Sequence, residues 1–337
     1  VKFDAATALY IGYYSAATLI AEGTGSKPIT FTSNATTPAP GDWEGIVFFN
    51  STDDASTVMK YCTVEYGGFA SYNSNINCNQ ASPTIQHCII RNSDGHGIYT
   101  TGSGALPLIS CSTITNNVNG VYAYNNSNPT LTDCRITGNT SYGVYNNSSA
   151  VTLDAENNWW GNADGPGGVA SGSGDAVSNY VDYTPWLTAD DACLLTVSLS
   201  PLSGTNLIGS QHTVTVTVED EASDPIEGKV VFFYITSGPH AGTNGNDTTD
   251  ANGEATFTYT GTLVGTDTIE ASISDFFGRT ITSNSVTQTW EVPATPIPTP
   301  SPSPSPEPSP TPSLEPTPTP EASPTPTVEP TSTYVPT

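Results

Sequence analysis

Basic side chains are scarce in this chain, which holds only seven lysine and arginine residues among 337. Its 32 aspartate and glutamate residues leave a formal net charge of -25 at pH 7. A nucleic acid or an anionic membrane surface requires a sizeable basic patch, which seven dispersed cations cannot build. No run approaches the roughly 20 apolar residues of a membrane-spanning helix. We therefore expect no nucleic-acid partner and no membrane span in this region.

Charged residues of both signs are also few, at 12% of the chain, whereas Gly, Asn, Ser, Thr and Tyr are abundant. This composition disfavours helices and favours short strands joined by turns, so we predict an all-β protein. No signal peptide is visible. The chain opens with VKFDAATALYIG, as if within a strand, and we expect a processed or truncated piece of a longer protein.

A short unit recurs at a constant step in the middle of the chain. Glycine, an aliphatic residue and tyrosine follow one another from Gly97, Gly120 and Gly143. The length of this unit suits one coil of a parallel β-helix, in which three short strands wrap once and stack ~4.8 Å above the previous coil. The repeats resemble the right-handed parallel β-helix family, the pectate-lyase-like superfold. We assign residues 1–190 to such a β-helix.

Equivalent side chains of successive coils should form files along this β-helix. Strand alternation predicts that Ile98, Val121 and Val144 point inward. Four cysteines keep nearly the same period and predict an inward file of small buried side chains: Cys62, Cys88, Cys111 and Cys134. Stacked amides are expected at one turn, at Asn92, Asn116 and Asn139.

The six cysteines do not predict a disulfide framework. Side chains that run parallel in a file seldom reach the torsion of a disulfide bond, and Cys78 and Cys193 have no obvious mate. No spacing of cysteine and histidine suggests a zinc site. We therefore expect buried free thiols, and no metal-ligating set.

Longer alternating strands begin at Cys193. The segments TVTVEDEASDPIEGKVVFFYITSGPHAG and TTDANGEATFTYTG resemble the bacterial immunoglobulin-like group 1 domains of invasin and intimin. The resemblance implies a β-sandwich, which we place at residues 193–292, and a spacer role. Residues 293–337 are rich in Pro, Thr and Ser, and predict an extended, disordered linker or stalk.

One candidate for catalysis is the sequence GHG at Gly95 to Gly97. Polygalacturonase-type glycosidases carry such a motif beside paired aspartates, so the resemblance proposes Asp94, His96, Asp53 and Asp54 as catalytic candidates. Acid catalysis there needs two carboxylates roughly 5–10 Å apart. The alternative is that His96 is a turn residue, because Asn119 and Tyr142 occupy its place in the next two repeats. A lyase would instead need basic residues such as Arg91 and Arg135 around a uronate.

A candidate for ligand binding is the recurring tyrosine at Tyr99, Tyr122 and Tyr145. These rings should point outward and stack along one face of the β-helix. They either bind sugar rings or stabilise the coil by stacking on one another, with about 0.5–1.5 kcal/mol for each pair.

Acidic turns leave room for Ca²⁺ in VEDEASDPIE and NSTDDAS, although no fixed calcium loop is present. The order of modules predicts an extracellular, cell-surface protein that binds a polysaccharide or a cell-surface glycan. A polysaccharide-active enzyme (hydrolase, lyase or epimerase) and an architectural repeat in a layer are the alternatives. Whether the chain is an enzyme stays open, with binding favoured.

Overall fold

The computed structural model describes residues 1–69, 73–220 and 223–294, and strands, turns and loops account for all of them. Across these residues there is no helix with the length and apolarity that crossing a bilayer requires. Val1–Pro293 form one compact unit. The linker predicted for residues 293–337 lies almost wholly outside the described residues.

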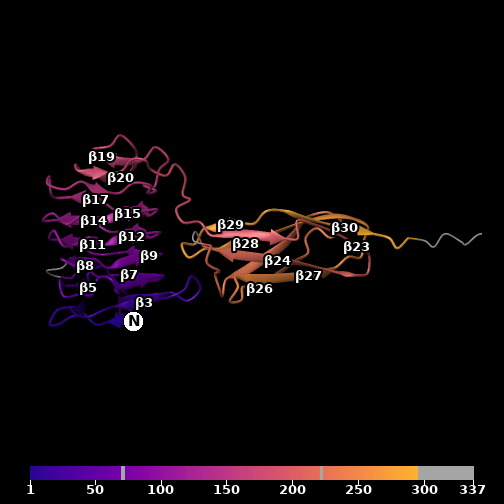
Figure 1. Ribbon diagram of the computed structural model, residues 1–337, viewed down its shortest axis with the longest axis horizontal. Coiled ribbons are helices and arrows are strands. Elements are labelled where there is room, and N and C mark those ends of the chain that lie inside the picture. The colour runs from indigo at the N-terminus through magenta and orange to yellow at the C-terminus, as the bar shows by residue number, and fades with distance from the viewer. Residues whose placement is uncertain (70–72, 221–222, 295–337) are drawn as a thin grey trace, which may run out of the picture. The chain divides into compact units, whose positions relative to one another are not determined.

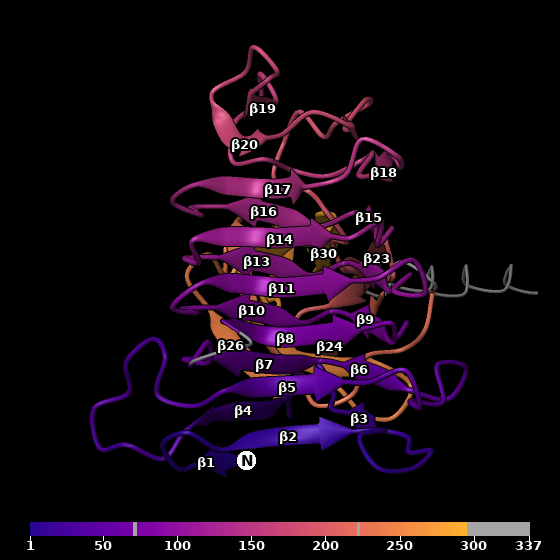
Figure 2. The same ribbon diagram turned by 90° about the vertical axis from the view of Figure 1, so that its left-hand side faces the viewer.

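Strands of the first part of the chain build three parallel sheets, in which each coil lies on the preceding one (Figures 1 and 2). The sheet that carries the repeated tyrosines comprises, in chain order, β2 (Ala8–Ile11), β5 (Gly45–Phe48), β8 (Ser74–Asn79), β11 (His96–Thr101), β14 (Asn119–Tyr124), β17 (Tyr142–Asn146), β19 (Pro166–Gly168) and β20 (Gly174–Val177).

The other two sheets consist of shorter strands. One comprises β1 (Lys2–Phe3), β4 (Ile29–Ser33), β7 (Cys62–Glu65), β10 (Ile89–Arg91), β13 (Thr113–Thr115) and β16 (Arg135–Thr137). The other comprises β3 (Ile20–Glu22), β6 (Val58–Lys60), β9 (Thr84–Gln86), β12 (Leu108–Ser110), β15 (Thr130–Thr132), β18 (Leu153–Asp154) and β21 (Val181–Asp182).

The core of this β-helix is made of aliphatic columns, one for each sheet. Ile98, Val121 and Val144 pair in register and are fully buried, so their predicted inward file is confirmed. Ile76 and Val177 extend the same column by one coil on either side. Apolar burial along such columns is the main favourable term for this fold.

The repeated glycine is required by close approach of the coils. A Cβ atom on Gly120 would lie 2.5 Å from the carbonyl oxygen of Gly143, and one on Gly97 would lie 2.7 Å from that of Gly120. Contacts this short force the backbone to move. The glycine of the triplet therefore lets successive coils stack at their normal spacing.

The repeat slips by one residue between sheets, and this overturns part of the cysteine prediction. β11, β14 and β17 keep a constant step, since Ile98 pairs with Val121 and Val121 with Val144. On β10, β13 and β16, however, Ile90 pairs with Ile114, and Ile114 with Ile136. The sequence separation of the first pair is one residue greater than that between paired residues of β11, β14 and β17, and that of the second pair is one residue smaller.

The slip moves Cys111 out of the file. By the same register Ser112 is level with Cys88 and Cys134, and Cys111 is level with His87 and Asp133. His87, Cys111 and Asp133 all adopt positive φ, of 49°, 48° and 51°, at one turn. A shift of one residue reverses the side to which a side chain points. The prediction that Cys111 lies in the inward file is therefore wrong.

The amide prediction fails for the same reason. Asn92 and Asn116 both have φ of 56° and occupy a left-handed turn position that Gly138 fills in the next coil. The inward amides are instead those of Asn117 and Asn139, whose Nδ2 and Oδ1 atoms lie 3.0 Å apart. Only Asn139 of the predicted set takes part.

The second part of the chain is a sandwich of two sheets, largely antiparallel. One sheet comprises β22 (Thr196–Ser200), β24 (Gln211–Glu219) and β27 (Glu254–Thr260). The other comprises β23 (Ser203–Leu207), β25 (Val230–Ser237), β26 (Asn244–Thr248), β28 (Gly265–Ser274), β29 (Thr280–Thr282) and β30 (Val286–Glu291).

A buried carboxylate cross-links the core of this sandwich. Asp267 is fully buried and its Oδ2 atom accepts hydrogen bonds from Tyr259 Oη at 3.0 Å and Trp290 Nε1 at 2.8 Å. His240 donates its backbone N–H to Oδ1 of Asp267 at 2.9 Å, and its Nδ1 lies 2.7 Å from Oδ2. Burial would raise the pKa of Asp267, but these hydrogen bonds outweigh it and the pKa lies below its ordinary value.

Candidate functional site

The repeated tyrosines lie side by side on β11, β14 and β17, as predicted. Tyr99 pairs in register with Tyr122, and Tyr122 with Tyr145. Their ring centroids are 5.7 Å and 4.9 Å apart, with interplanar angles of 20° and 19°. The rings therefore stack, and each covers part of its neighbour's face. Tyr145 is the last of the three; Tyr122 stacks on it, and the ring of Tyr142 packs edge-on against it with centroids 4.9 Å apart.

The hydroxyls of Tyr99 and Tyr122 are neutral donors. Burial raises the pKa of Tyr122, and neighbouring tyrosines raise it further. Burial also raises the pKa of Tyr99. A neutral phenol can both donate and accept a hydrogen bond, which suits the hydroxyl groups of a sugar.

His96 belongs to the same aromatic group and is not a turn residue, because it is the first residue of β11. Its ring stacks on Tyr122 with centroids 4.5 Å apart, and its Nδ1 accepts a hydrogen bond from Asn119 Nδ2 at 3.0 Å. Burial lowers the pKa of His96 to about 4. The imidazole is thus neutral at physiological pH and acts as a packing partner of the tyrosines.

A pocket of about 320 Å³ opens where the file ends. Ser178 follows Val177, which pairs with Val144, so this small residue stands in the next coil where another tyrosine would have been. The change from tyrosine to serine leaves space beyond Tyr145. The pocket is lined by Tyr142, Tyr145, Asn146, Asn147, Ser148, Ser149, Val169, Ser178, Asn179 and Tyr180.

No charged side chain is among these lining residues, which offer rings, amides and hydroxyls. The wall is held by Asn146, whose Nδ2 donates to the carbonyl oxygens of Val151 at 2.9 Å and Tyr180 at 2.8 Å. Its Oδ1 accepts the backbone N–H of Ser148 at 2.9 Å. This buried amide fixes the loop after β17 against the following coil, so the pocket is preformed.

Two of the three candidate aspartates, Asp53 and Asp54, are not gathered around His96. Asp53 and Asp54 come after the end of β5, whereas His96 begins β11, so they belong to opposite strand ends of one sheet. The Oδ1 atom of Asp54 accepts the backbone N–H of Ser82 at 2.7 Å. Asp94 is exposed, and its backbone N–H bonds to Gly67. The catalytic hypothesis stays a prediction.

The two arginines considered for a uronate site are both engaged. Arg91 Nε lies 2.8 Å from Glu65 Oε2, and Arg135 Nε lies 2.8 Å from Asp190 Oδ2. Among the residues that the structure describes, no three His, Cys, Asp or Glu side chains are grouped as a metal site requires. Part of the acidic turn considered for Ca²⁺ falls in residues 221–222, outside the described residues.

The structure also corrects the expectation that all cysteines are free. Cys111 and Cys193 form a disulfide bond, with Cα atoms 5.4 Å apart. The slip that turns Cys111 outward makes this bond possible. Cys62, Cys78, Cys88 and Cys134 are free and buried, and burial raises the pKa of Cys134 to about 12.

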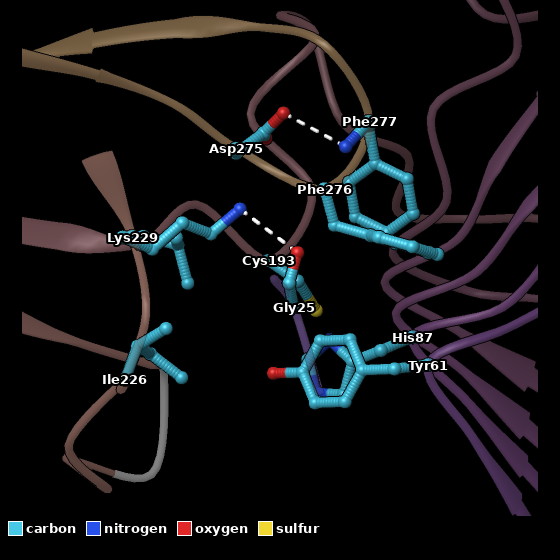
Figure 3. A pocket seen from close by; sticks show the side chains of 10 residues that line it. Gly25, Tyr61, His87, Cys193, Ile226, Lys229, Asp275, Phe276 and Phe277 are labelled. Atoms are coloured by element: carbon cyan, nitrogen blue, oxygen red, sulfur yellow. Dashed lines mark hydrogen bonds between the residues drawn. The ribbon is translucent and has the colours of Figure 1, made fainter. Parts of the chain in front are cut away.

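Beside Cys193 lies a cavity of only about 10 Å³, which holds no more than a water molecule (Figure 3). Lys229 Nζ donates to the carbonyl oxygen of Gly25 at 3.1 Å there, and the ring of Phe276 packs edge-on against Tyr61. This cavity is a packing gap and offers no space for a ligand.

Sequence reasoning identified Tyr145 but missed the rest of the pocket. Tyr142 is in the repeat, at the position of His96, and could have been found by following that column. Asn179 and Tyr180 come after the last regular repeat, where no period indicates which coil position they take.

Comparison with known families matches residues 22–182 to the right-handed β-helix region and residues 209–288 to the bacterial Ig-like domain (group 1). The comparison with curated proteins gave no match. A solved structure of a CARDB domain from Pyrococcus furiosus, in complex with di-metal ions, aligns over 30% of this chain and 96% of that chain. Its sequence identity is 17% and its TM-score 0.22, too low to carry an argument.

Proposed function

Because the chain carries a right-handed β-helix region followed by a group 1 bacterial Ig-like domain, we propose that it is an exported surface protein that binds a neutral polysaccharide. The β-helix would be the binding head and the Ig-like domain its spacer, with the Pro-rich residues 293–337 as a stalk. The modules fit a surface protein, and the ligand class has to come from the site.

The observation that carries the proposal is the pocket at the end of the tyrosine file. Its rings and its border of amide and hydroxyl groups suit a pyranose, which has apolar faces and a polar edge. An anionic sugar would need a cation, and the lining has none. A lining without Asp, Glu, His, Lys or Arg also favours binding over cleavage, because glycoside hydrolysis uses a pair of carboxyl groups.

Within the site, Tyr145 would stack on the sugar ring, and Asn147, Ser148 and Asn179 would bond its hydroxyls. Tyr99 and Tyr122 would act mainly through Tyr145, because their faces are partly covered by neighbouring rings. The stacked file would thus present a single sugar-binding ring, that of Tyr145, and would hold that ring in its orientation.

The test is binding of the purified chain to five neutral polysaccharides: a β-glucan, an α-glucan, a mannan, a xylan and a galactan. Tyr145→Ala should weaken binding about tenfold, since loss of one stacking contact of about 1.4 kcal/mol corresponds to this factor. Tyr234→Ala is the matched control, because Tyr234 is an exposed tyrosine on β25 of the sandwich. Absence of binding to all five, or an unchanged affinity of Tyr145→Ala, would overturn the proposal.

A further inference from the structure

A second group of aromatic side chains lies in the first coil. Tyr10 is on β2, Tyr13 and Tyr14 follow that strand, and Phe49 follows β5. The ring of Tyr13 has its centroid 5.4 Å from Tyr10, 4.5 Å from Tyr14 and 4.7 Å from Phe49. Tyr14 is 94% exposed, which is extreme for a ring of this size.

These rings border a hollow of about 260 Å³, whose lining is Tyr10, Gly12, Tyr13, Tyr14, Ser15 and Ala17. Tyr10 Oη donates to Glu44 Oε2 at 2.7 Å, which places a carboxylate acceptor at the rim. The three exposed rings carry hydroxyl groups, and no basic side chain lines the hollow. Rings with polar tips and one strong acceptor suit a sugar with free hydroxyls, and exclude a polyanion.

The two aromatic groups lie on one row of one sheet. Tyr10 pairs with Val47, Val47 with Asn77, and Asn77 with Tyr99, where the file begins. Val47 is fully buried and Asn77 is 4% exposed, so the row is covered between the two groups. They are therefore separate sites on the same face. Five strand spacings of ~4.8 Å put Tyr10 about 24 Å from Tyr145.

We propose that Tyr10, Tyr13 and Tyr14 form a second sugar-binding site, and that an extended neutral polysaccharide bridges it to the pocket at Tyr145. This inference rests on the proposed function, since it takes the same class of ligand. A chain that binds at both places gains affinity because its second contact is intramolecular. A disaccharide is too short to bridge them and would bind each site independently.

The experiment uses the tightest-binding of the five polysaccharides and its disaccharide, with calorimetry to give both affinity and stoichiometry. Two disaccharides should bind the native chain, and one should bind either Tyr13→Ala/Tyr14→Ala or Tyr145→Ala. Both variants should weaken binding of the polymer at least tenfold. Tyr13 and Tyr14 are exposed, so their replacement should leave the fold intact, as circular dichroism would verify.

The failure of each proposal is distinguishable. An unchanged stoichiometry and polymer affinity in Tyr13→Ala/Tyr14→Ala, with a loss in Tyr145→Ala, would overturn the second site and leave the proposed function intact. A loss only in Tyr13→Ala/Tyr14→Ala would support the first-coil site and overturn the pocket at Tyr145. Lack of binding to any of the five polysaccharides would overturn both.

Discussion

Removal of the disulfide bond should have a large effect on stability. Cys111 and Cys193 are separated by 82 residues, which include the last coils of the β-helix. Closing a loop of this length lowers the entropy of the unfolded chain, and the chain-entropy relation gives about 4.5 kcal/mol at 25 °C. We expect Cys111→Ser/Cys193→Ser to lower the free energy of unfolding by up to this amount. Serine is close to cysteine in size, so the loss should come from the missing bond and not from a change in the turn backbone.

The assay is urea unfolding of both proteins, with and without a reductant. The native chain should become less stable when reduced, whereas the double variant should not respond. Alkylation after unfolding, followed by mass spectrometry, counts the thiols: four without reductant and six with it. Six alkylated cysteines without reductant, or equal midpoints for variant and native chain, would refute the reasoning.

Two further changes test the interior. The pKa of His96 is lowered to about 4 from an ordinary 6.5, so the unfolded chain takes up this proton first and the His96 contribution to stability falls as the pH drops from about 6.5 to 4. His96→Asn, which copies Asn119 of the next coil, should flatten that part of a melting-temperature profile, and a profile with unchanged slope would contradict it. Asp267→Asn should destabilise the sandwich by about 1–3 kcal/mol, because it leaves a buried network of donors incompletely satisfied. Calorimetry should then show a lower sandwich transition, and an unaltered transition would exclude the role given to Asp267.

The fold could be predicted because a fixed period, a glycine at each close approach and alternating aliphatic residues all indicate the same coil. Ile98, Val121 and Val144 followed this pattern to the correct face. Cys111 did not follow the pattern, because the number of residues from one coil to the next differs between the sheets. While the tyrosine sheet keeps a constant step, the neighbouring sheet has one step that is a residue longer and a next that is a residue shorter. The repeat length alone does not show where the extra residue is inserted. The disulfide bond depends on that position, because the insertion turns Cys111 out of the inward file.

The site was only partly predictable for a related reason. The stacking of Tyr99, Tyr122 and Tyr145 follows from the repeat, but the pocket exists because the next coil breaks it with Ser178. The aromatic group at Tyr10, Tyr13 and Tyr14 lies on β2 and on the loop that follows it, before the regular repeats begin. The pocket at Tyr145 and the hollow at Tyr10, Tyr13 and Tyr14 both arise where the sequence departs from the repeat. A search for repeated residues therefore does not predict them.

The most direct measurement is the crystal structure of the chain with a bound hexasaccharide of the tightest-binding polysaccharide. We predict a sugar ring against the face of Tyr145 that is turned away from Tyr122, with its hydroxyls bonded to Asn147, Ser148 or Asn179. A ligand seated on the sandwich, or a cleaved product beside Asp94 and His96, would contradict this account.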